Sequence, residues 1–201
     1  MKKSKLIIVA GLPATGKSTV SRKLANAFDL PILEKDEIKE DMFDTIGFAD
    51  RTQKRALDTA ANRILLRAAE AVLKGGGSLL LVNNFDACES ERVQAMLDAC
   101  GCRAVTVFLN GDADVLHARY VERDRKKSRH PGHTFIDRYP IRPGDDPDAE
   151  MPREYFAERF EKMGMADFKL KGKRIELDAT YPEKIDMDAL IREIAAAFEE
   201  E

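Results

Sequence analysis

The chain has 201 residues, a formal net charge of -3, 44% hydrophobic residues and 34% charged residues. That size and balance are typical of one globular domain with a substantial core, and the acidic charge argues against a general polyanion binder. The apolar run LIIVA near the N-terminus is too short for a signal peptide or a membrane span, and the three cysteines form no CxxC pair. We therefore expect a single cytoplasmic domain spanning residues 1–201.

Five short apolar runs are expected to form strands, and some of them are almost continuously apolar. Such runs are typical of strands buried on both faces of a parallel sheet. The expected strands are residues 5–10, 31–35, 78–84, 104–110 and 174–180. Helical periodicity lies between and after them, at residues 17–28, 35–43, 51–74, 89–99, 113–127, 153–163 and 187–200. This alternation predicts an α/β fold with right-handed crossovers.

The stretch GLPATGKST, residues 11–19, lies directly after the first expected strand and before the first expected helix. It fits the phosphate-loop (P-loop) pattern, in which glycines let backbone N–H groups turn toward phosphate oxygens and a helix N-terminus attracts the same anion. In that pattern Lys17 reaches the β- and γ-phosphates and the Ser18 hydroxyl binds Mg²⁺. The sequence therefore predicts a site for a nucleoside triphosphate with Mg²⁺, formed by Gly11, Pro13, Ala14, Thr15, Gly16, Lys17, Ser18 and Thr19.

A charged stretch, EKDEIKEDMF, follows the second expected strand. Asp36 falls at the carboxyl end of that strand, where open α/β sheets bind their ligands. A carboxylate there can accept the proton of an attacking hydroxyl or lie in the shell of Mg²⁺, and helix capping is the alternative for Asp36. Glu34 and Glu37 are weaker candidates for the same roles, and Lys35 and Lys39 are expected on solvated faces.

Residues 119–133 carry six Arg and Lys residues against two Asp and Glu. Arg119 and Arg123 are four residues apart and so lie on one helix face. We expect a mobile lid whose arginines stabilise transition-state charge and exclude water, with a solvated basic helix end as the alternative. His130 and His133 are interpreted as loop or substrate-contacting residues rather than metal ligands.

The lid continues into residues 134–152, which show no apolar periodicity and contain several prolines. A loop this long in a compact domain is usually functional or mobile. One interpretation is that Arg138, Tyr139 and Arg142 shape a substrate site, and disorder is the other. The lid and this loop together comprise residues 119–152.

The motifs GLPATGKST, KDEIKEDMFD, LVNNF and RHPGH together resemble P-loop small-molecule kinases of the zeta-toxin and chloramphenicol-phosphotransferase type, a group of AAA-type ATP-binding proteins. The resemblance implies five parallel strands in the order 2-3-1-4-5, with ATP and Mg²⁺ on the donor side and a hydroxyl group as acceptor. It gives Lys17 and Ser18 the phosphate and metal roles and Asp36 the role of base. It also places Arg119 and Arg123 at the lid arginines, near adenine and phosphates.

The resemblance covers residues 5–133, with weaker similarity in the last strand and helix, and the chain departs from the family near the end of the third strand and in residues 134–152. Relatives often carry an acidic residue near the end of the third strand, whereas this strand reads LLLVNNFD and its first acid is Asp86. We expect Asn83 or Asn84 to orient a metal-bound water or the acceptor instead. A shikimate kinase is expected to carry a glycine triplet just after a strand, but residues 75–77 precede one.

These observations favour an ATP-dependent kinase that transfers the γ-phosphate to a hydroxyl group of a small molecule. The alternatives are a nucleotide-sensing regulatory ATPase without an acceptor and a polynucleotide 5′-hydroxyl kinase, although the acidic charge argues against nucleic acid. The acceptor site is expected at residues 36–47, the start of helix 51–74, residues 83–85 and the loop after His133, where Phe43, Phe48 and Phe85 also fall. These segments suit a polyol, an amino sugar or a nucleoside equally, so the acceptor and the oligomeric state stay open.

Overall fold

The centre of the protein is a five-stranded parallel sheet in the order β2-β3-β1-β4-β5. The computed structural model describes residues 4–146 and 149–199. The strands are β1 (Lys5–Gly11), β2 (Ile32–Glu34), β3 (Leu79–Val82), β4 (Arg103–Asn110) and β5 (Lys173–Asp178). The α/β class and the strand order predicted for the P-loop kinases are therefore confirmed.

Seven α-helices of the described residues connect and cover the strands. They are α1 (Lys17–Phe28), α2 (Lys35–Thr45), α3 (Arg51–Lys74), α4 (Ser90–Cys100), α5 (Ala113–Arg125), α6 (Arg153–Lys162) and α7 (Met187–Glu199). Every helix predicted from periodicity is present, with ends that differ by at most two residues, while residue 200 lies outside the described part. Within the described residues, no helix is long and apolar enough to cross a membrane.

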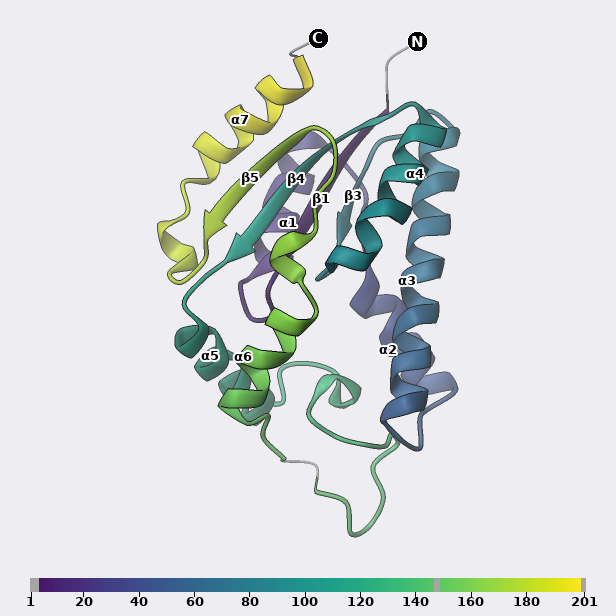
Figure 1. Ribbon diagram of the computed structural model, residues 1–201, viewed down its shortest axis with the longest axis vertical. Coiled ribbons are helices and arrows are strands. Elements are labelled where there is room, and N and C mark those ends of the chain that lie inside the picture. Colours follow the sequence, from purple (N-terminus) through teal and green to yellow (C-terminus); the bar gives the residue numbers. More distant parts are fainter. Residues whose placement is uncertain (1–3, 147–148, 200–201) are drawn as a thin grey trace.

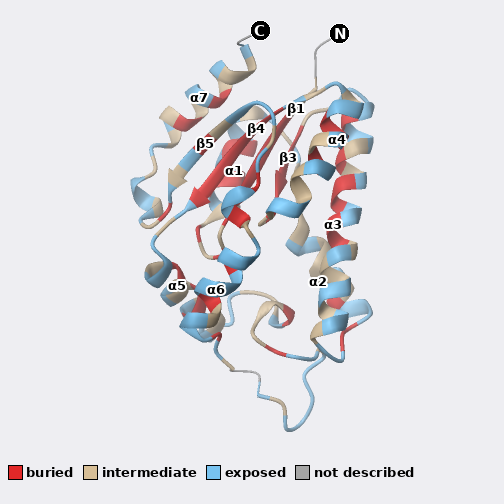
Figure 2. Ribbon diagram, in the orientation of Figure 1, coloured by how far each residue is buried: buried red, intermediate tan, exposed pale blue. Residues whose placement is uncertain are grey.

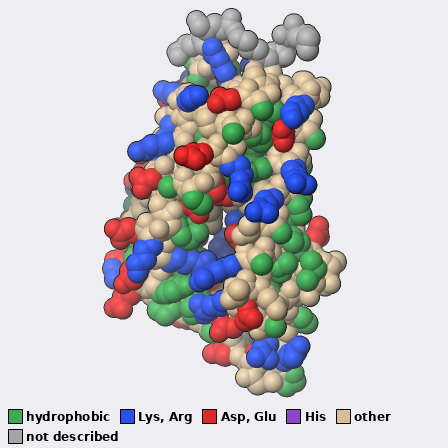
Figure 3. Space-filling model, turned by 45° about the vertical axis from the view of Figure 1, so that its right-hand side comes forward, with side chains coloured by type: hydrophobic (Ala, Val, Ile, Leu, Met, Phe, Trp, Pro, Cys, Tyr) green, Lys and Arg blue, Asp and Glu red, His purple; other side chains and the backbone are tan. Residues whose placement is uncertain are grey.

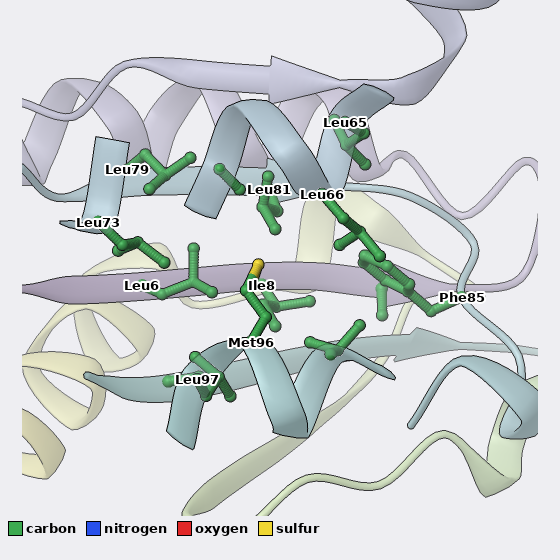
Figure 4. Close-up of a cluster of buried hydrophobic side chains, with 14 of the residues drawn as sticks. Leu6, Ile8, Leu65, Leu66, Leu73, Leu79, Leu81, Phe85, Met96 and Leu97 are labelled. Carbon is green, nitrogen blue, oxygen red and sulfur yellow. The ribbon is translucent and has the colours of Figure 1, made fainter. Parts of the chain in front are cut away.

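Each central strand buries side chains on both faces, which explains the continuous apolar runs. In β1, Leu6 and Ile8 face one layer with α3 and α4, while Ile7 and Val9 face the opposite layer with α1 and α7. Figure 4 shows the first layer, where Leu6 and Ile8 lie among side chains of β3, α3 and α4, and Phe85 lies at one end. In Figure 2 the buried residues accordingly concentrate in the strands and along one side of α3.

The carboxyl ends of the strands open toward the lower half of Figure 1, where a second set of elements gathers. On one side α5 and α6 pack together through an apolar cluster that includes Tyr120 and Phe156. On the other side α2 and the first turns of α3 share a cluster around Phe43 and Phe48. The loop after α5 runs between these two sides, so the space beyond the sheet is enclosed by elements that lie outside the two sheet layers.

The described part of the long loop is fastened to α2 and α3. Tyr139 forms an antiparallel bridge with Phe48 and its hydroxyl donates to Asp44 at 2.9 Å. Gly132 lies so close to the Phe43 ring that an added Cβ would be 2.3 Å from a ring carbon. Tyr139 therefore holds the loop, and Arg138 pairs with Asp145 inside it at 3.5 Å. Arg138, Tyr139 and Arg142 do not line the cavity described below, unlike the role considered for them.

Candidate active site

The P-loop has a backbone that requires glycine where β1 ends. Gly11 has φ 132°, and a Cβ at this position would lie 2.0 Å from the carbonyl oxygen of Leu109 on β4. Gly16 takes the left-handed conformation, φ 84°, directly before α1 begins at Lys17. The loop therefore curls from the buried strand to the helix N-terminus, as the sequence pattern predicts.

Within the described residues, the backbone N–H groups of residues 14–18 donate to no acceptor of the chain, whereas those of Thr19 and Val20 bond to Gly16. Consecutive free N–H groups at a helix N-terminus form an anion-binding concavity. Lys17 Nζ lies over this loop and donates to the carbonyl oxygens of Gly11 (3.1 Å) and Leu12 (2.7 Å). Burial lowers the pKa of Lys17 to about 7, although Asp36 opposes the shift. These groups fit a triphosphate.

Ser18 and Glu34 form the oxygen-rich edge of the same site. The Ser18 hydroxyl donates to Glu34 Oε1 at 2.8 Å. Burial raises the pKa of Glu34, and the hydrogen bond from Ser18 opposes that shift. A hydroxyl and carboxylates are the hard ligands that Mg²⁺ prefers, so Ser18 and Glu34 fit the metal of a nucleotide complex, with Asp36 beside them in the same cavity. Glu34, a weaker candidate in the sequence, thus holds a more direct position than expected.

Asp36 lies in the first turn of α2 and lines the cavity. Burial would raise its pKa, but positive charges that include Lys39 and Lys35 hold it below the ordinary value. Asp36 is therefore ionised at neutral pH and can accept a proton. Helix capping by Asp36 is wrong, because α2 begins at Lys35 and the residue before it, Glu34, occupies the N-cap position.

Lys35 and Lys39 do not lie on solvated faces as expected. Their side chains are only 12% and 13% exposed, and both pair with Asp58 on α3, at 3.2 Å and 2.7 Å. The positive charge of Lys35 beside Asp58 lowers the pKa of that carboxyl despite its partial burial. This triad ties α2 to α3 and holds the turn that carries Asp36.

The two asparagines after β3 have different environments. Asn83 is buried and donates from Nδ2 to Asn62 on α3 at 3.1 Å, while its Oδ1 accepts the backbone N–H of Asn84 at 2.7 Å. Asn62 in turn donates to Glu89. Asn84 lines the cavity. Of the two candidates, Asn84 is the one placed to face a ligand, and Asn83 holds it there.

The two lid arginines point to different places. Arg119 donates to the backbone carbonyls of Ala179 (2.8 Å) and Thr180, on the loop after β5, and does not line the cavity. Arg123 lines the cavity, and its Nε is buried without a hydrogen-bond partner among the described residues. Arg123 thus faces the phosphate side, whereas a catalytic role for Arg119 stays a prediction without a side-chain contact to the cavity.

His130 and His133 fix the lid to α2. His130 accepts the backbone N–H of Gly132 at Nδ1, so its Nε2 donates to Asp44 at 3.0 Å. His133 Nε2 lies 3.0 Å from Glu40. Burial lowers the pKa of His133 to about 3, which makes it a neutral imidazole on the cavity wall.

A cavity of about 890 Å³ joins the P-loop to α2, α3, α6 and the lid. Ten cationic side chains and five carboxylates line it, and Figure 3 shows Lys and Arg side chains around a hollow on this side of the molecule. Asp36, Lys39 and Glu40, Asn84, the start of α3 and the loop after His133 line it, whereas residues 41–47 of the predicted acceptor segment do not, and Phe43, Phe48 and Phe85 are buried beneath. The contribution of α6 was missed, because nothing in its sequence connects it with the P-loop.

Comparisons with known proteins support a kinase fold. A family model described as an AAA domain matches residues 6–137, more than half of the chain. A candidate kinase from Chloroflexus aurantiacus has a crystal structure that superimposes with a TM-score of 0.80 at 32% identity, covering 97% of this chain and 98% of that chain.

Two enzymes are similar over a shorter span. The shikimate kinase of Rhizobium meliloti is 29% identical over 150 residues, which cover 67% of this chain and 71% of that enzyme. The shikimate kinase of Brucella canis is 28% identical over 131 residues, which cover 61% of this chain and 58% of that enzyme. The chain thus spans less than two thirds of the Brucella enzyme's length, and the family match ends before α6 and β5.

Proposed function

Because this chain belongs to the AAA domain family, we propose that it is an ATP-dependent kinase that transfers the γ-phosphate to a hydroxyl group of a small molecule. The proposed cofactor is Mg²⁺. The proposed location is the cytoplasm, which supplies ATP and a reducing environment for the three cysteines. The observation that carries it is the position of Asp36. This ionised carboxylate lines one cavity together with the P-loop and with residues of α3, α6 and the lid.

Each residue of the phosphate side has a role in this reaction. The free N–H groups of residues 14–18 and the Lys17 ammonium bind the triphosphate, and Arg123 neutralises charge as it develops on the transferred group. Ser18 and Glu34 would hold Mg²⁺, which would neutralise phosphate charge when bound. Asp36 accepts the proton of the acceptor hydroxyl as that oxygen attacks.

The regulatory ATPase is the second candidate, since a P-loop alone does not require an acceptor. The two differ in what fills the space between α3, α6 and the lid. A kinase places an acceptor there, and a sensor leaves it to solvent or to a protein partner. The polynucleotide kinase requires a basic channel long enough for a strand, and the acidic chain supports it least.

The test is ADP release from ATP·Mg²⁺ with and without a panel of sugars, nucleosides, aminoglycosides, chloramphenicol, hydroxy acids and oligonucleotides. We expect one class to raise turnover above the hydrolytic background. Asp36→Asn should reduce that acceptor-dependent rate by about 10²–10⁴-fold, the usual contribution of a general base, while ATP binding is retained.

Asp41→Asn is the matched control, because Asp41 is an exposed carboxylate on the same helix outside the cavity. It should leave turnover unchanged. Full acceptor-dependent activity in Asp36→Asn would remove Asp36 as the base. An ADP release that no compound stimulates, equal in both variants and the wild type, would favour the regulatory ATPase.

A further inference from the structure

The cavity between α3, α6 and the lid contains cations that the phosphate chemistry above does not use. Lys54, in the first turn of α3, and Arg159 on α6 both line it. Arg159 and three further cations each lower the pKa of Lys54. We call this group the cationic wall; its members are Lys39, Arg51, Lys54, Arg129 and Arg159.

Two members of the cationic wall have no carboxylate partner among the described residues. Lys54 Nζ donates to the carbonyl oxygens of Thr134 (2.9 Å) and Ile136 (3.3 Å) of the lid. The guanidinium carbon of Arg159 lies over the rings of Tyr155 and Phe160, 5.9 Å and 5.8 Å from their centroids. The other members are paired, as Lys39 with Asp58, Arg51 with Asp137 and Arg129 with Asp124.

Placing these positive charges close together disfavours the protonated form of Lys54. Burial, and then the four neighbouring cations, lower the pKa of Lys54 to about 7. Lys54 lowers the pKa of Asp124, a carboxyl that already pairs with Arg129. An anionic ligand between Lys54 and Arg159 would relieve the repulsion and give both a charged partner.

The cationic wall and the phosphate site line one cavity. The charges that act most on Lys17 are Asp36, Arg123 and Glu34, and none of them is among those acting most on Lys54. Asp36 lines the cavity as well, and both Lys17 and Lys39 lower its pKa. A molecule whose hydroxyl meets Asp36 can therefore extend toward the cationic wall instead of back over the P-loop.

The helix spacing places the cationic wall near the turn that carries Asp36. Lys54 and Asp58 are one turn apart on α3, and Asp58 holds Lys35, the residue before Asp36. Lys54 and Asp36 also line the same cavity. One ligand in this cavity can therefore contact both residues.

Building on the proposed kinase function, we propose that the acceptor is an anionic small molecule. Its hydroxyl meets Asp36, and its carboxylate or phosphate group is bound by Lys54 and Arg159. In the transfer, the hydroxyl oxygen forms the new bond to phosphorus, ADP leaves with the electrons of the broken bond, and the hydroxyl proton passes to Asp36.

The experiment compares acceptors that differ in charge. ADP release is measured with shikimate against its methyl ester and gluconate against glucitol as the carboxylate arm, and glycerol 3-phosphate against glycerol as the phosphate arm. We expect only anionic members to stimulate the wild type. Arg159→Gln and Lys54→Met should raise the KM for the anionic acceptor by about tenfold or more, the value of a charged hydrogen bond, while the KM for ATP stays unchanged.

Three variants separate recognition from folding. The Arg159 side chain makes no hydrogen bond among the described residues, so Arg159→Gln removes charge without loosening the lid. Lys54→Arg keeps the charge and should restore much of what Lys54→Met loses. Arg67→Gln, an exposed site further along α3, is the matched control and should change neither KM.

Two results distinguish this proposal from the kinase function itself. Equal stimulation by neutral acceptors, or variants whose KM for the acceptor is unchanged, would overturn the anionic site and leave the kinase standing. If no compound stimulates turnover, the melting temperature of the ADP·Mg²⁺-loaded protein is measured with the same compounds. A rise with anions that Arg159→Gln and Lys54→Met abolish supports the site without transfer, and the lack of such a rise overturns it.

Discussion

Lys17 has an unusual environment for a lysine, because its ammonium group is held over backbone carbonyls and shielded from water. That shielding makes the charged form expensive and explains a pKa of about 7. A triphosphate in the loop would reverse the balance, because its negative charge favours the protonated lysine. The residue is therefore a proton acceptor in the binding step, before any chemistry occurs.

We predict that ATP·Mg²⁺ binding takes up close to one proton at pH 8 and much less at pH 6, where Lys17 is already charged. Calorimetry in buffers of different ionisation enthalpy measures this uptake. Lys54→Met should retain it, which would assign the proton to Lys17, since Lys54 also has a pKa of about 7. Binding at pH 8 without proton uptake would contradict a shielded Lys17.

At the scale of elements, α2 depends on α3 for its position. The contact between them is polar at one end, where Asp58 binds Lys35 and Lys39, and aromatic at the other, around Phe43. The polar end lies beside Asp36, so it fixes the direction of the proposed base. The aromatic end contacts the lid, and this contact limits how far the lid can move away from the cavity.

Asp58→Asn should lower the free energy of unfolding by roughly 1 kcal/mol, since the Asp58 carboxylate is 42% exposed and ion pairs of that exposure contribute at most about 1 kcal/mol each. It should also reduce kcat more than the KM for ATP, because Lys35 flanks Asp36. Chemical denaturation and steady-state kinetics measure the two effects. An unchanged kcat would show that the triad does not position Asp36.

The same variant has a defined pH dependence. The folded-state pKa of Asp58 is depressed, so its contribution to stability is present above the unfolded pKa of about 3.9 and is lost as pH falls below it. The stability difference between wild type and Asp58→Asn should thus be constant above about pH 5 and shrink below pH 4. A difference that grows toward low pH would contradict the assignment.

The phosphate side was predictable because its signals are local. Strand, glycine loop and helix are consecutive in the chain, so Gly11, Lys17 and Ser18 could be placed from spacing alone. The pairing of Lys35 with Asp58 could not, because it depends on how α2 packs against α3 across 23 positions. Arg119 is another case. It lies one turn from Arg123 and was expected to share the role of Arg123, but the loop after β5, distant in sequence, provides the carbonyl partners of Arg119.

At the scale of the whole molecule, the walls of the cavity are built differently from the sheet. The strands lie between two large apolar layers, whereas α5 with α6, and α2 with the lid, rest on two small clusters. Regions with fewer buried apolar contacts open more easily than the core. The cavity therefore combines a rigid floor with walls of lower stability.

Hydrogen exchange followed by mass spectrometry should show this division. Amides of β1 and β4 should exchange only through global unfolding, and amides of residues 128–146 should exchange faster by local opening. A non-hydrolysable ATP analogue should slow exchange in the P-loop and around Arg123. Equal protection of the lid and the central strands would show that the molecule opens as one unit.

The position of α6 beyond the family match has a consequence for inheritance. The region that matches the family, residues 6–137, contains the phosphate site, while Arg159 lies on α6, which follows that region. In our proposal the acceptor site thus combines Lys54, inside the family match, with Arg159, beyond it, so exchanging α6 alters one part of acceptor recognition and leaves the phosphate site unchanged. A chimaera that receives α6 from another kinase of this fold should keep its affinity for ATP and change its acceptor specificity.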